Sequence, residues 1–151
     1  MSTLVERARW VGVHLEQLPA VADAVGNHLP LDGVVAVHGA MGAGKTTLVR
    51  ALLQAWGVGE DGASPTFGLV HHHTVVRQGI SVEVRHFDLY RLEDEEEAER
   101  SGIAEMLGER GLSLVEWPER VPGLMPDDAH LLEASVEEDG SRTFILSSLR
   151  G

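Results

Sequence analysis

The residues with the clearest chemical potential lie in one glycine-rich segment, residues 39–46, which matches the phosphate-binding pattern G-x-x-x-x-G-K-[ST]. In such a loop, successive backbone N–H groups surround nucleotide phosphates at a helix N-terminus. Lys45 is the single lysine of the chain and is expected to reach the β- and γ-phosphates, while Thr46 is expected to bind Mg²⁺. The expected nucleotide contacts in this segment are Gly39, Met41, Gly42, Ala43, Gly44, Lys45, Thr46 and Thr47.

Two carboxylates at predicted strand ends are candidates to complete a hydrolytic site. Glu116 ends the apolar run of residues 112–116, and Asp88 ends the run of residues 82–88. Nucleotide hydrolysis needs an acid at such a place, either to hold Mg²⁺ through its water shell or to orient the attacking water. The alternative for each is a helix-capping or loop-surface carboxylate.

Three other features have weaker functional signals. Thr66 lies in a Ser-Pro-Thr segment that can bring a hydroxyl to the γ-phosphate, as switch segments do. Trp117 directly follows Glu116 and either packs in the core or lines the nucleotide pocket. Residues 71–73 are three histidines, but side chains alternate between the faces of a strand, so a surface or edge strand is favoured over a metal site.

The single lysine also bears on the choice of base. Guanine-specific GTPases of the Ras type read the base with an Asn-Lys-x-Asp segment, and no second lysine exists to build one. ATP is therefore the expected nucleotide, with Mg²⁺ as the expected metal.

Hydrophobic periodicity predicts the elements that position these residues. A first helix places Leu18, Val21, Ala22, Val25 and Leu29 on one face, residues 45–56 form a second helix, and short helical pieces fill residues 94–107. Strands are expected over residues 9–15, 33–38, 69–77, 80–87, 112–116, 129–137 and 142–149. This order indicates an α/β fold, a P-loop NTPase-like mixed β-sheet flanked by helices with a C-terminal β-hairpin. We expect one P-loop ATPase domain over residues 1–151.

Composition limits the class of protein further. At 151 residues and 43% hydrophobic content the chain suits one globular domain, and it has no apolar stretch of membrane-spanning length, no secretory segment and no cysteine. We therefore expect a cytoplasmic protein. The formal net charge of −12 opposes direct binding of RNA phosphates, so we expect any nucleic-acid role to be delegated to a basic partner. Simple solubility is the alternative reason for the charge.

Four ordered segments together resemble a known family. Residues 39–47 read G-A-M-G-A-G-K-T-T, residues 64–70 S-P-T-F-G-L-V, residues 86–92 H-F-D-L-Y-R-L and residues 114–118 L-V-E-W-P. They are similar to the P-loop, switch, H-F-D-L-Y-R and V-E-W-P motifs of the TsaE (YjeE) family, the small P-loop ATPases of bacterial tRNA threonylcarbamoyladenosine synthesis. The segments span most of the chain, and the ordered set is specific.

The resemblance implies an ATP- and Mg²⁺-binding fold in which Thr46 and Glu116 lie near the metal, Asp88 contributes to hydrolysis and Thr66 belongs to the switch. It also implies two partner subunits of the actin-like ATPase fold, a TsaB-type subunit and a TsaD-type threonylcarbamoyl transferase that modifies the adenosine next to the anticodon. The ATPase would contact tRNA only through this complex and would be slow alone.

Three segments depart from the family pattern. Leu18 and Pro19 stand where the family often has a threonine near the adenine, and residues 71–73 replace an Asn-Glu-Tyr-like segment. Residues 140–142 stand in place of a Gly-Arg hairpin, which makes Arg142 a candidate contact for the nucleotide or a partner.

Two other functions use the same loop. A small-molecule kinase needs arginines on a mobile lid to clamp the transferred group, and no long lid insertion is visible. A non-catalytic nucleotide sensor would bind ATP without turnover. The arginines that fit the kinase hypothesis are Arg91, Arg100, Arg110 and Arg120.

Overall fold

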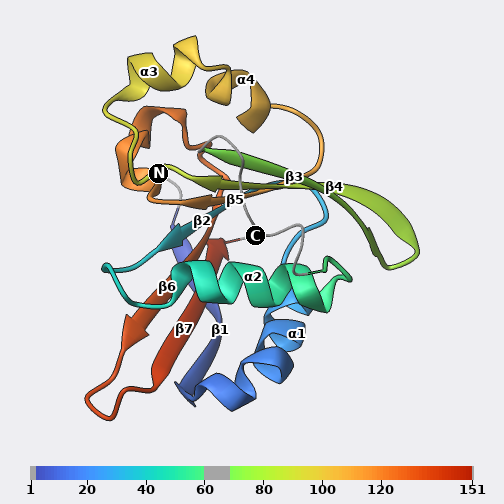
Figure 1. Cartoon of the computed structure of the whole chain (residues 1–151), viewed down its shortest axis with the longest axis vertical. Coiled ribbons are helices and arrows are strands. Elements are labelled where there is room, and N and C mark those ends of the chain that lie inside the picture. The colour runs from blue at the N-terminus through green and yellow to red at the C-terminus, as the bar shows by residue number, and fades with distance from the viewer. Residues whose placement is uncertain (1–2, 60–68, 151) are drawn as a thin grey trace.

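The structure is a computed structural model that describes residues 3–59 and 69–150, and its seven strands form one sheet (Figure 1). The strand order across the sheet is β1-β7-β6-β2-β5-β4-β3. The strands are β1 Leu4–Val13, β2 Gly33–His38, β3 Val70–Arg77, β4 Ile80–Asp88, β5 Leu112–Glu116, β6 His130–Val136 and β7 Arg142–Leu149.

The sheet is mixed. Strand β2 pairs in parallel with both β5 and β6, and β4 pairs in parallel with β5. The outer pairs β1–β7, β6–β7 and β3–β4 are antiparallel. The mixed sheet and the C-terminal hairpin β6–β7 confirm the predicted fold class.

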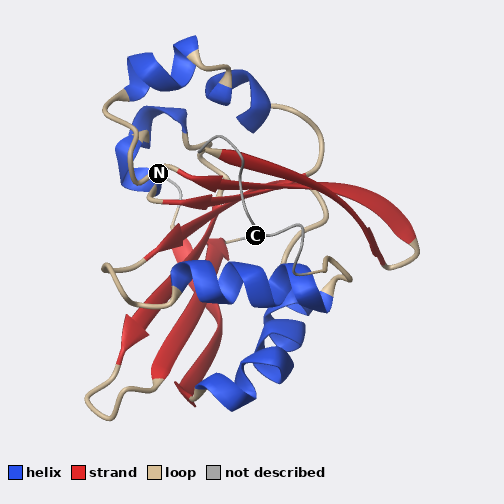
Figure 2. Cartoon of the chain, in the orientation of Figure 1, coloured by secondary structure: helices blue, strands red, loops and turns tan. Residues whose placement is uncertain are grey.

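Helices cover both faces of the sheet (Figures 1 and 2). Helices α1 Leu18–His28 and α2 Lys45–Ala55 pack together on one face, and α3 Glu95–Arg100 and α4 Ile103–Leu107 lie on the other. Three 3-10 turns, η1 Leu15–Gln17, η3 Pro118–Arg120 and η4 Pro122–Leu124, connect these elements. Among the residues that the structure describes, no helix is long and apolar enough to cross a membrane.

Strand alternation divides the core into two clusters. In β2, Val35 and Val37 belong to the cluster under α1 and α2, whereas Val34 belongs to the cluster under α3 and α4. Helix α2 contributes Leu48 and Leu52, both fully buried, to the first cluster. Each such leucine contributes about 1.5–3 kcal/mol by leaving water, which fixes the start of α2 over the sheet.

The first strand differs from the prediction of residues 9–15. It begins at Leu4, which pairs with Leu149, and it ends at Val13. Register shifts between Glu6 and Ala8 and between Trp10 and Val13 interrupt the alternation that marks a strand in the sequence. The 3-10 turn η1 follows directly and ends the strand.

Two hairpin turns contain residues with positive φ, and Asp94 caps a helix. In the β3–β4 hairpin, Gln78 and Gly79 have φ of 53° and 75°, which fits a type I′ turn, and Gly140 in the β6–β7 loop has φ of 86°. Asp94 caps α3 by accepting a hydrogen bond from the Glu97 N–H at 2.9 Å. The acidic run of residues 93–97 therefore lies at the N-terminus of α3.

The pairing of the central strands determines where the functional side chains meet. In the parallel ladders, Glu116 at the end of β5 lies level with Val37 of β2 and with Asp88 of β4. The loop that follows β2 leads into α2 at the same edge. Ligands of open α/β sheets bind at this edge, where the carboxyl ends of parallel strands meet.

Candidate functional site

The loop between β2 and α2 has the backbone geometry that phosphate binding requires. Gly42 and Gly44 have φ of 83° and 97°, in the left-handed region that glycine adopts without strain. Gly39 is required for a different reason, because a Cβ there would lie 2.5 Å from the carbonyl oxygen of Ala134. The glycines therefore let the loop turn tightly against β6 and lead into α2, which begins at Lys45.

The side chain of Lys45 is buried within this loop. Its relative exposure is 5%, its Nζ donates a hydrogen bond to the Gly39 carbonyl at 2.5 Å, and the same Nζ lies 3.4 Å from the centre of the Trp117 ring. Burial lowers the pKa of Lys45, and the negative charge of carboxylates, led by Glu119, opposes that shift. The Lys45 ammonium thus contacts the neutral Gly39 carbonyl and the Trp117 ring, with three carboxylates close enough to act on its charge.

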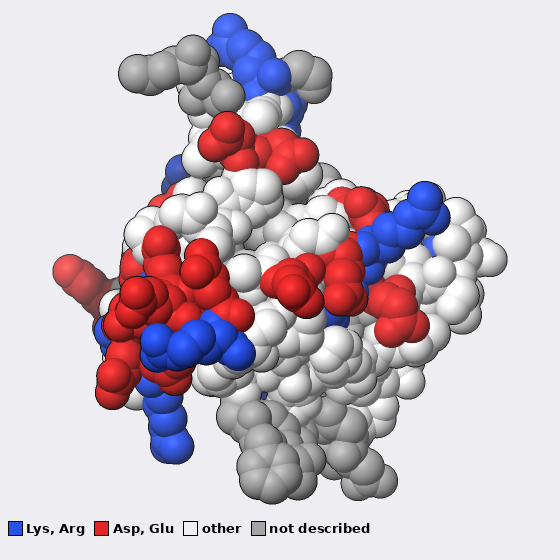
Figure 3. Space-filling view, turned by 90° about the horizontal axis from the view of Figure 1, so that it is seen from above, with Lys and Arg blue, Asp and Glu red and all other residues white. Residues whose placement is uncertain are grey.

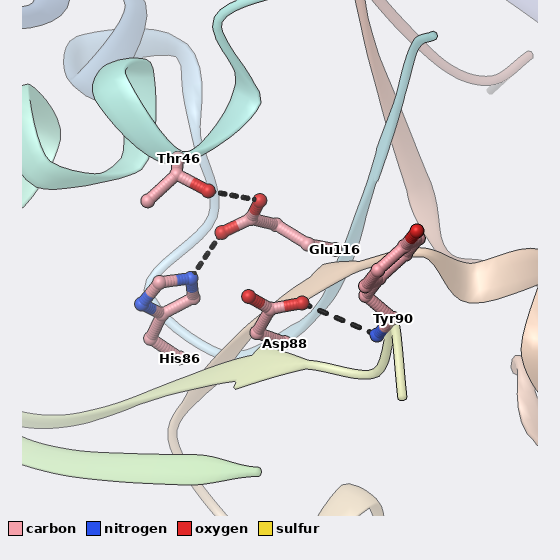
Figure 4. Close-up of polar contacts among 5 residues, drawn as sticks. All are labelled: Thr46, His86, Asp88, Tyr90 and Glu116. Carbon is pink, nitrogen blue, oxygen red and sulfur yellow. Dashed lines mark hydrogen bonds and ion pairs between the residues drawn. The ribbon is translucent and has the colours of Figure 1, made fainter. Parts of the chain in front are cut away.

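Thr46 and Glu116 are in direct contact (Figure 4). The Thr46 hydroxyl donates a hydrogen bond to Oε1 of Glu116 at 2.6 Å, and His86 Nε2 lies 2.5 Å from Oε2 of the same carboxylate. Glu116 is only 1% exposed. The structure therefore places the predicted loop hydroxyl and the strand-end acid together, although they are separated by 70 positions in sequence.

Asp88 lies beside this pair on the neighbouring strand, as Figure 4 shows. Its Oδ1 accepts a hydrogen bond from the Tyr90 backbone N–H at 3.2 Å, and its side chain is half-buried. Its negative charge acts on Lys45, where it favours the ammonium form by raising the pKa against the stronger effect of burial. Both strand-end acids thus lie near the phosphate loop.

Trp117 both packs and lines the site. It packs against the core cluster under α3 and α4, and its ring lies 5.0 Å from that of Tyr90, while its other contact is the Lys45 ammonium. Its backbone is left-handed, with φ of 59° and ψ of 50°, which is uncommon for a large residue. A residue keeps this backbone conformation only where the surrounding structure holds it, and such residues are found most often at functional sites.

Two adjoining pockets meet over the phosphate loop. The P-loop pocket has a volume of about 230 Å³, and the β1–α1 pocket has about 200 Å³; they share Gly44, Thr47 and Arg142. The P-loop pocket is lined by Met41, Gly42, Gly44, Lys45, Thr46, Thr47, Glu116, Trp117 and Arg142. The β1–α1 pocket is lined by Val13, His14, Leu15, Leu18, Gly44, Thr47, Gly140, Arg142 and Phe144.

Arg142 joins the hairpin to the loop. Its guanidinium donates hydrogen bonds to the carbonyls of Gly140 at 2.5 Å and Gly42 at 3.3 Å. A Cβ on Gly44 would lie 3.3 Å from Nε of Arg142, so the two are in close contact. The structure therefore places this predicted contact residue at the junction of the two pockets.

The sequence interpretation missed most of the β1–α1 pocket. His14, Leu15 and Phe144 have no motif around them, and they come from the end of β1, the turn η1 and strand β7. Leu18 was predicted on the apolar face of the first helix and, with Pro19, at the expected base side of the site. The one available signal was the Leu-Pro pair at the expected base side, because pairing of β1 with β7 was needed to bring the rest together.

The histidine segment forms part of an edge strand, as predicted. Strand β3 is the last strand of the sheet, and the rings of His71 and His73 lie on one face with centres 5.9 Å apart, while His72 is exposed. In the part of the chain that the structure describes, no group of three or more potential ligands is arranged to hold a metal ion. Thr66, the proposed switch residue, lies outside the described residues.

Comparison with known proteins shows which protein family this chain resembles. A family model described as "Threonylcarbamoyl adenosine biosynthesis protein TsaE" matches residues 13–144. That match includes the phosphate loop, both strand-end acids and Arg142.

Curated relatives carry the same description. A Haemophilus influenzae protein named "tRNA threonylcarbamoyladenosine biosynthesis protein TsaE" is 39% identical over 108 residues, covering 70% of this chain and 65% of that protein. A Treponema pallidum protein of that name is 34% identical over 120 residues, covering 78% and 84%. The chain thus spans just under two thirds of the Haemophilus relative and most of the Treponema relative.

A solved structure shows the same fold. The crystal structure of Bacillus subtilis YdiB superposes with a TM-score of 0.71 at 21% identity, covering 99% of this chain and 88% of that one. At this identity the likeness concerns the arrangement of the strands and helices.

Proposed function

The chain belongs to the TsaE family, and from this premise we propose that it is an ATP-binding and ATP-hydrolysing accessory subunit of tRNA threonylcarbamoyladenosine synthesis. It acts in complex with a TsaD-type transferase and a TsaB-type subunit, which modify the adenosine next to the anticodon. The observation that carries the hydrolytic part of the proposal is the hydrogen bond between the half-buried Thr46 and the buried Glu116.

That contact fits a magnesium site. A threonine hydroxyl and a carboxylate are the oxygen ligands that Mg²⁺ uses in P-loop proteins, directly or through water. Here they are 2.6 Å apart at the end of a buried strand, so both would lie close enough to serve one ion, the carboxylate directly or through a water. When bound, Mg²⁺ neutralises charge on the β- and γ-phosphates. We assign Thr46 and Glu116 to hold it.

The other residues of the P-loop pocket bind and orient the triphosphate. The backbone N–H groups of the loop, Met41 and Ala43 included, surround the phosphates, and Lys45 exchanges its contacts with Gly39 and Trp117 for the β- and γ-phosphates. Asp88 is placed to orient the attacking water. Thr66 is proposed to complete the site as a switch residue.

The β1–α1 pocket is the proposed site of the adenosine. Leu15 is 75% exposed and offers an apolar surface for a flat base above the buried Leu18 and Phe144, and the pocket reaches the start of α2 at Thr47. Arg142 lies between the pockets and is proposed to contact the nucleotide where base and phosphates join.

The charge of the chain supports delivery of tRNA by partners. Acidic side chains gather on the face that carries α3 and α4 (Figure 3), in keeping with the formal net charge of −12. Such a surface repels an RNA backbone and attracts a basic protein surface. We therefore propose that tRNA reaches the complex through the partner subunits.

The test measures ATP turnover and tRNA retention for the chain alone and then with the two partner subunits. We expect slow turnover and poor tRNA binding alone, and an increase in both with the partners, because docking completes the site. Tight, salt-sensitive tRNA binding by the chain alone would overturn the argument from charge. Phosphoryl transfer to a small metabolite would favour the kinase, and ATP binding without turnover under all conditions would favour the sensor.

A further inference from the structure

The two oxygens of the Glu116 carboxylate have different partners. Oε1 accepts a hydrogen bond from the Thr46 hydroxyl at 2.6 Å, and Oε2 lies 2.5 Å from Nε2 of His86 (Figure 4). His86 is buried, with 8% exposure, and Glu116 has 1%. Rotation of the carboxylate about its last bond would break both hydrogen bonds and would leave the buried His86 without its carboxylate partner.

We infer that His86 is a positioning residue, which holds the Glu116 carboxylate so that its other oxygen faces Thr46 and the P-loop pocket. The inference rests on the proposed function of that pocket as a Mg²⁺–nucleotide site. His86 itself does not line the pocket; it acts through Glu116.

The position of His86 on its strand explains why it can do this. On β4, His86 lies level with Leu114, two residues before Glu116, and Asp88 is level with Glu116 itself. The His86 imidazole therefore extends along the strand direction to Oε2 of Glu116. Asp88 lies level with Glu116 on the neighbouring strand. Groups that hydrogen-bond a metal ligand from behind fix its orientation, and their removal typically costs about tenfold to a hundredfold in metal affinity.

The edge strand supports the imidazole of His86. His71 is directly opposite His86 in the β3–β4 ladder, and their rings stack with centres 5.8 Å apart at 27°. His73 stacks on His71 in turn, at 5.9 Å and 13°. This row of flat rings restricts rotation of the His86 side chain, so the β3 edge is connected to the carboxylate through packing.

His73, at the far end of the row, is a half-buried ring. Its Nε2 is the one buried side-chain polar atom of the described residues that has no hydrogen-bond partner. Burial, and then the charge of His86, lowers its pKa. The rings of His71 and His73 therefore hold the His86 ring in place by packing. The polar contact of the His86 ring is its hydrogen bond with Glu116.

Two substitutions separate the hydrogen bond from the shape of the ring. His86→Phe keeps a flat ring without a donor, and His86→Gln keeps a donor on a side chain of different shape. His72→Phe is the matched control, because His72 lies on β3 with its side chain exposed. Thermal unfolding of each variant establishes that it is folded.

The measurement is the ATP affinity of the purified chain by calorimetry, with and without Mg²⁺. We expect His86→Phe to lose about tenfold or more of the Mg²⁺-dependent gain in affinity, with Mg²⁺-free affinity within about twofold of the parent. His86→Gln should retain most of the gain, and His72→Phe all of it. If His86→Phe shows the same Mg²⁺-dependent increase in ATP affinity as the parent, the inference about His86 is wrong but the proposed function still stands. If the parent itself shows no increase in ATP affinity with Mg²⁺, the proposed function is contradicted.

A second measurement does not depend on any variant being stable. Long-range ¹H–¹⁵N spectra of the nucleotide-free parent should show the His86 ring protonated at Nε2, the nitrogen that faces Glu116. An Nε2 without a proton would overturn the inference, because the ring could not then donate to the carboxylate.

Discussion

In the P-loop pocket, Lys45 and Glu116 are buried and Glu116 is bonded directly to Thr46, whereas the β1–α1 pocket is lined by apolar and polar side chains from separate segments. Thr46, Glu116 and His86 form a continuous set of hydrogen bonds on the α2 side of the sheet. Leu15, on the rim of the other pocket, is 75% exposed. The two pockets nevertheless share the peptide at Gly44.

Under the proposed function, this difference predicts that the two pockets have different roles. Catalysis requires groups held in place before the substrate arrives, because the transition state gains only from interactions that need no reorganisation. Binding of a flat apolar base requires area but little directional precision. Changes in the P-loop pocket should therefore alter turnover, and changes in the β1–α1 pocket should alter affinity.

The largest effect is expected from Lys45→Ala, which removes the side chain of the single lysine, the residue proposed to contact the transferred phosphoryl group. We expect turnover to fall by about a hundredfold to a thousandfold, with weak ATP binding retained. Steady-state ATP hydrolysis checks this. Arg50→Ala is the matched control, since Arg50 lies exposed on the same helix and should leave turnover unchanged. Full turnover by Lys45→Ala would refute the loop assignment.

The two strand-end acids should give different results. Glu116→Gln and Asp88→Asn should each lower turnover by about a hundredfold, but only Glu116→Gln should strongly weaken the Mg²⁺ dependence of ATP affinity. The physical reason is that Glu116 contacts Thr46, whereas Asp88 bonds the Tyr90 backbone. Mg²⁺ titrations of ATP binding separate the roles. Identical titration curves for both variants and the parent would contradict the assignment.

A smaller effect, on affinity alone, is expected in the β1–α1 pocket. Leu15→Ala should weaken ATP binding by about threefold to tenfold, with the maximal rate unchanged, because it removes apolar area from the base surface. Since Leu15 is 75% exposed, the fold should not depend on it. Val11→Ala is the control, as Val11 is similarly exposed but lies outside the pocket. A fall in the maximal rate with unchanged affinity would break the division between the pockets.

The smallest effect concerns the edge strand behind the P-loop pocket. Burial holds the pKa of His73 below its ordinary value of 6.5, so the unfolded chain binds a proton more readily than the folded one. The stability due to neutral His73 is present above pH 6.5 and is lost as the pH falls toward the folded-state pKa. Between roughly pH 7.5 and pH 5.5, His73→Leu should lose less melting temperature than the parent. An equal fall in melting temperature for His73→Leu and the parent would contradict this prediction. So would a fall in His72→Leu that is as small as the fall in His73→Leu.

How much of the site could be predicted depended on how local its determinants are. The phosphate loop is a contiguous pattern, and Glu116 and Asp88 each end an apolar run, so their meeting followed from the rule that parallel strand ends share one edge. The fold class followed in the same way. The partner of Thr46 could be anticipated, but the use of the second Glu116 oxygen by His86 could not, because it depends on the register of β4 against β5.

The remainder of the structure depended on contacts between distant segments. The bounds of β1 were wrong because its bulges hide the alternation and because its pairing partner, β7, lies at the other end of the chain. The β1–α1 pocket depends on that same pairing. The position of Trp117 between core and pocket was left open by the sequence, and it is set by the left-handed backbone that follows β5.

The most direct test of the account is a double-mutant cycle on Thr46 and Glu116, read out as the gain in ATP affinity that Mg²⁺ provides. If the two side chains hold one ion, Thr46→Ala, Glu116→Gln and the double variant should lose nearly the same gain, within about 0.5 kcal/mol. Losses that add in the double variant would contradict a shared magnesium site, and with it the claim that this pocket hydrolyses ATP.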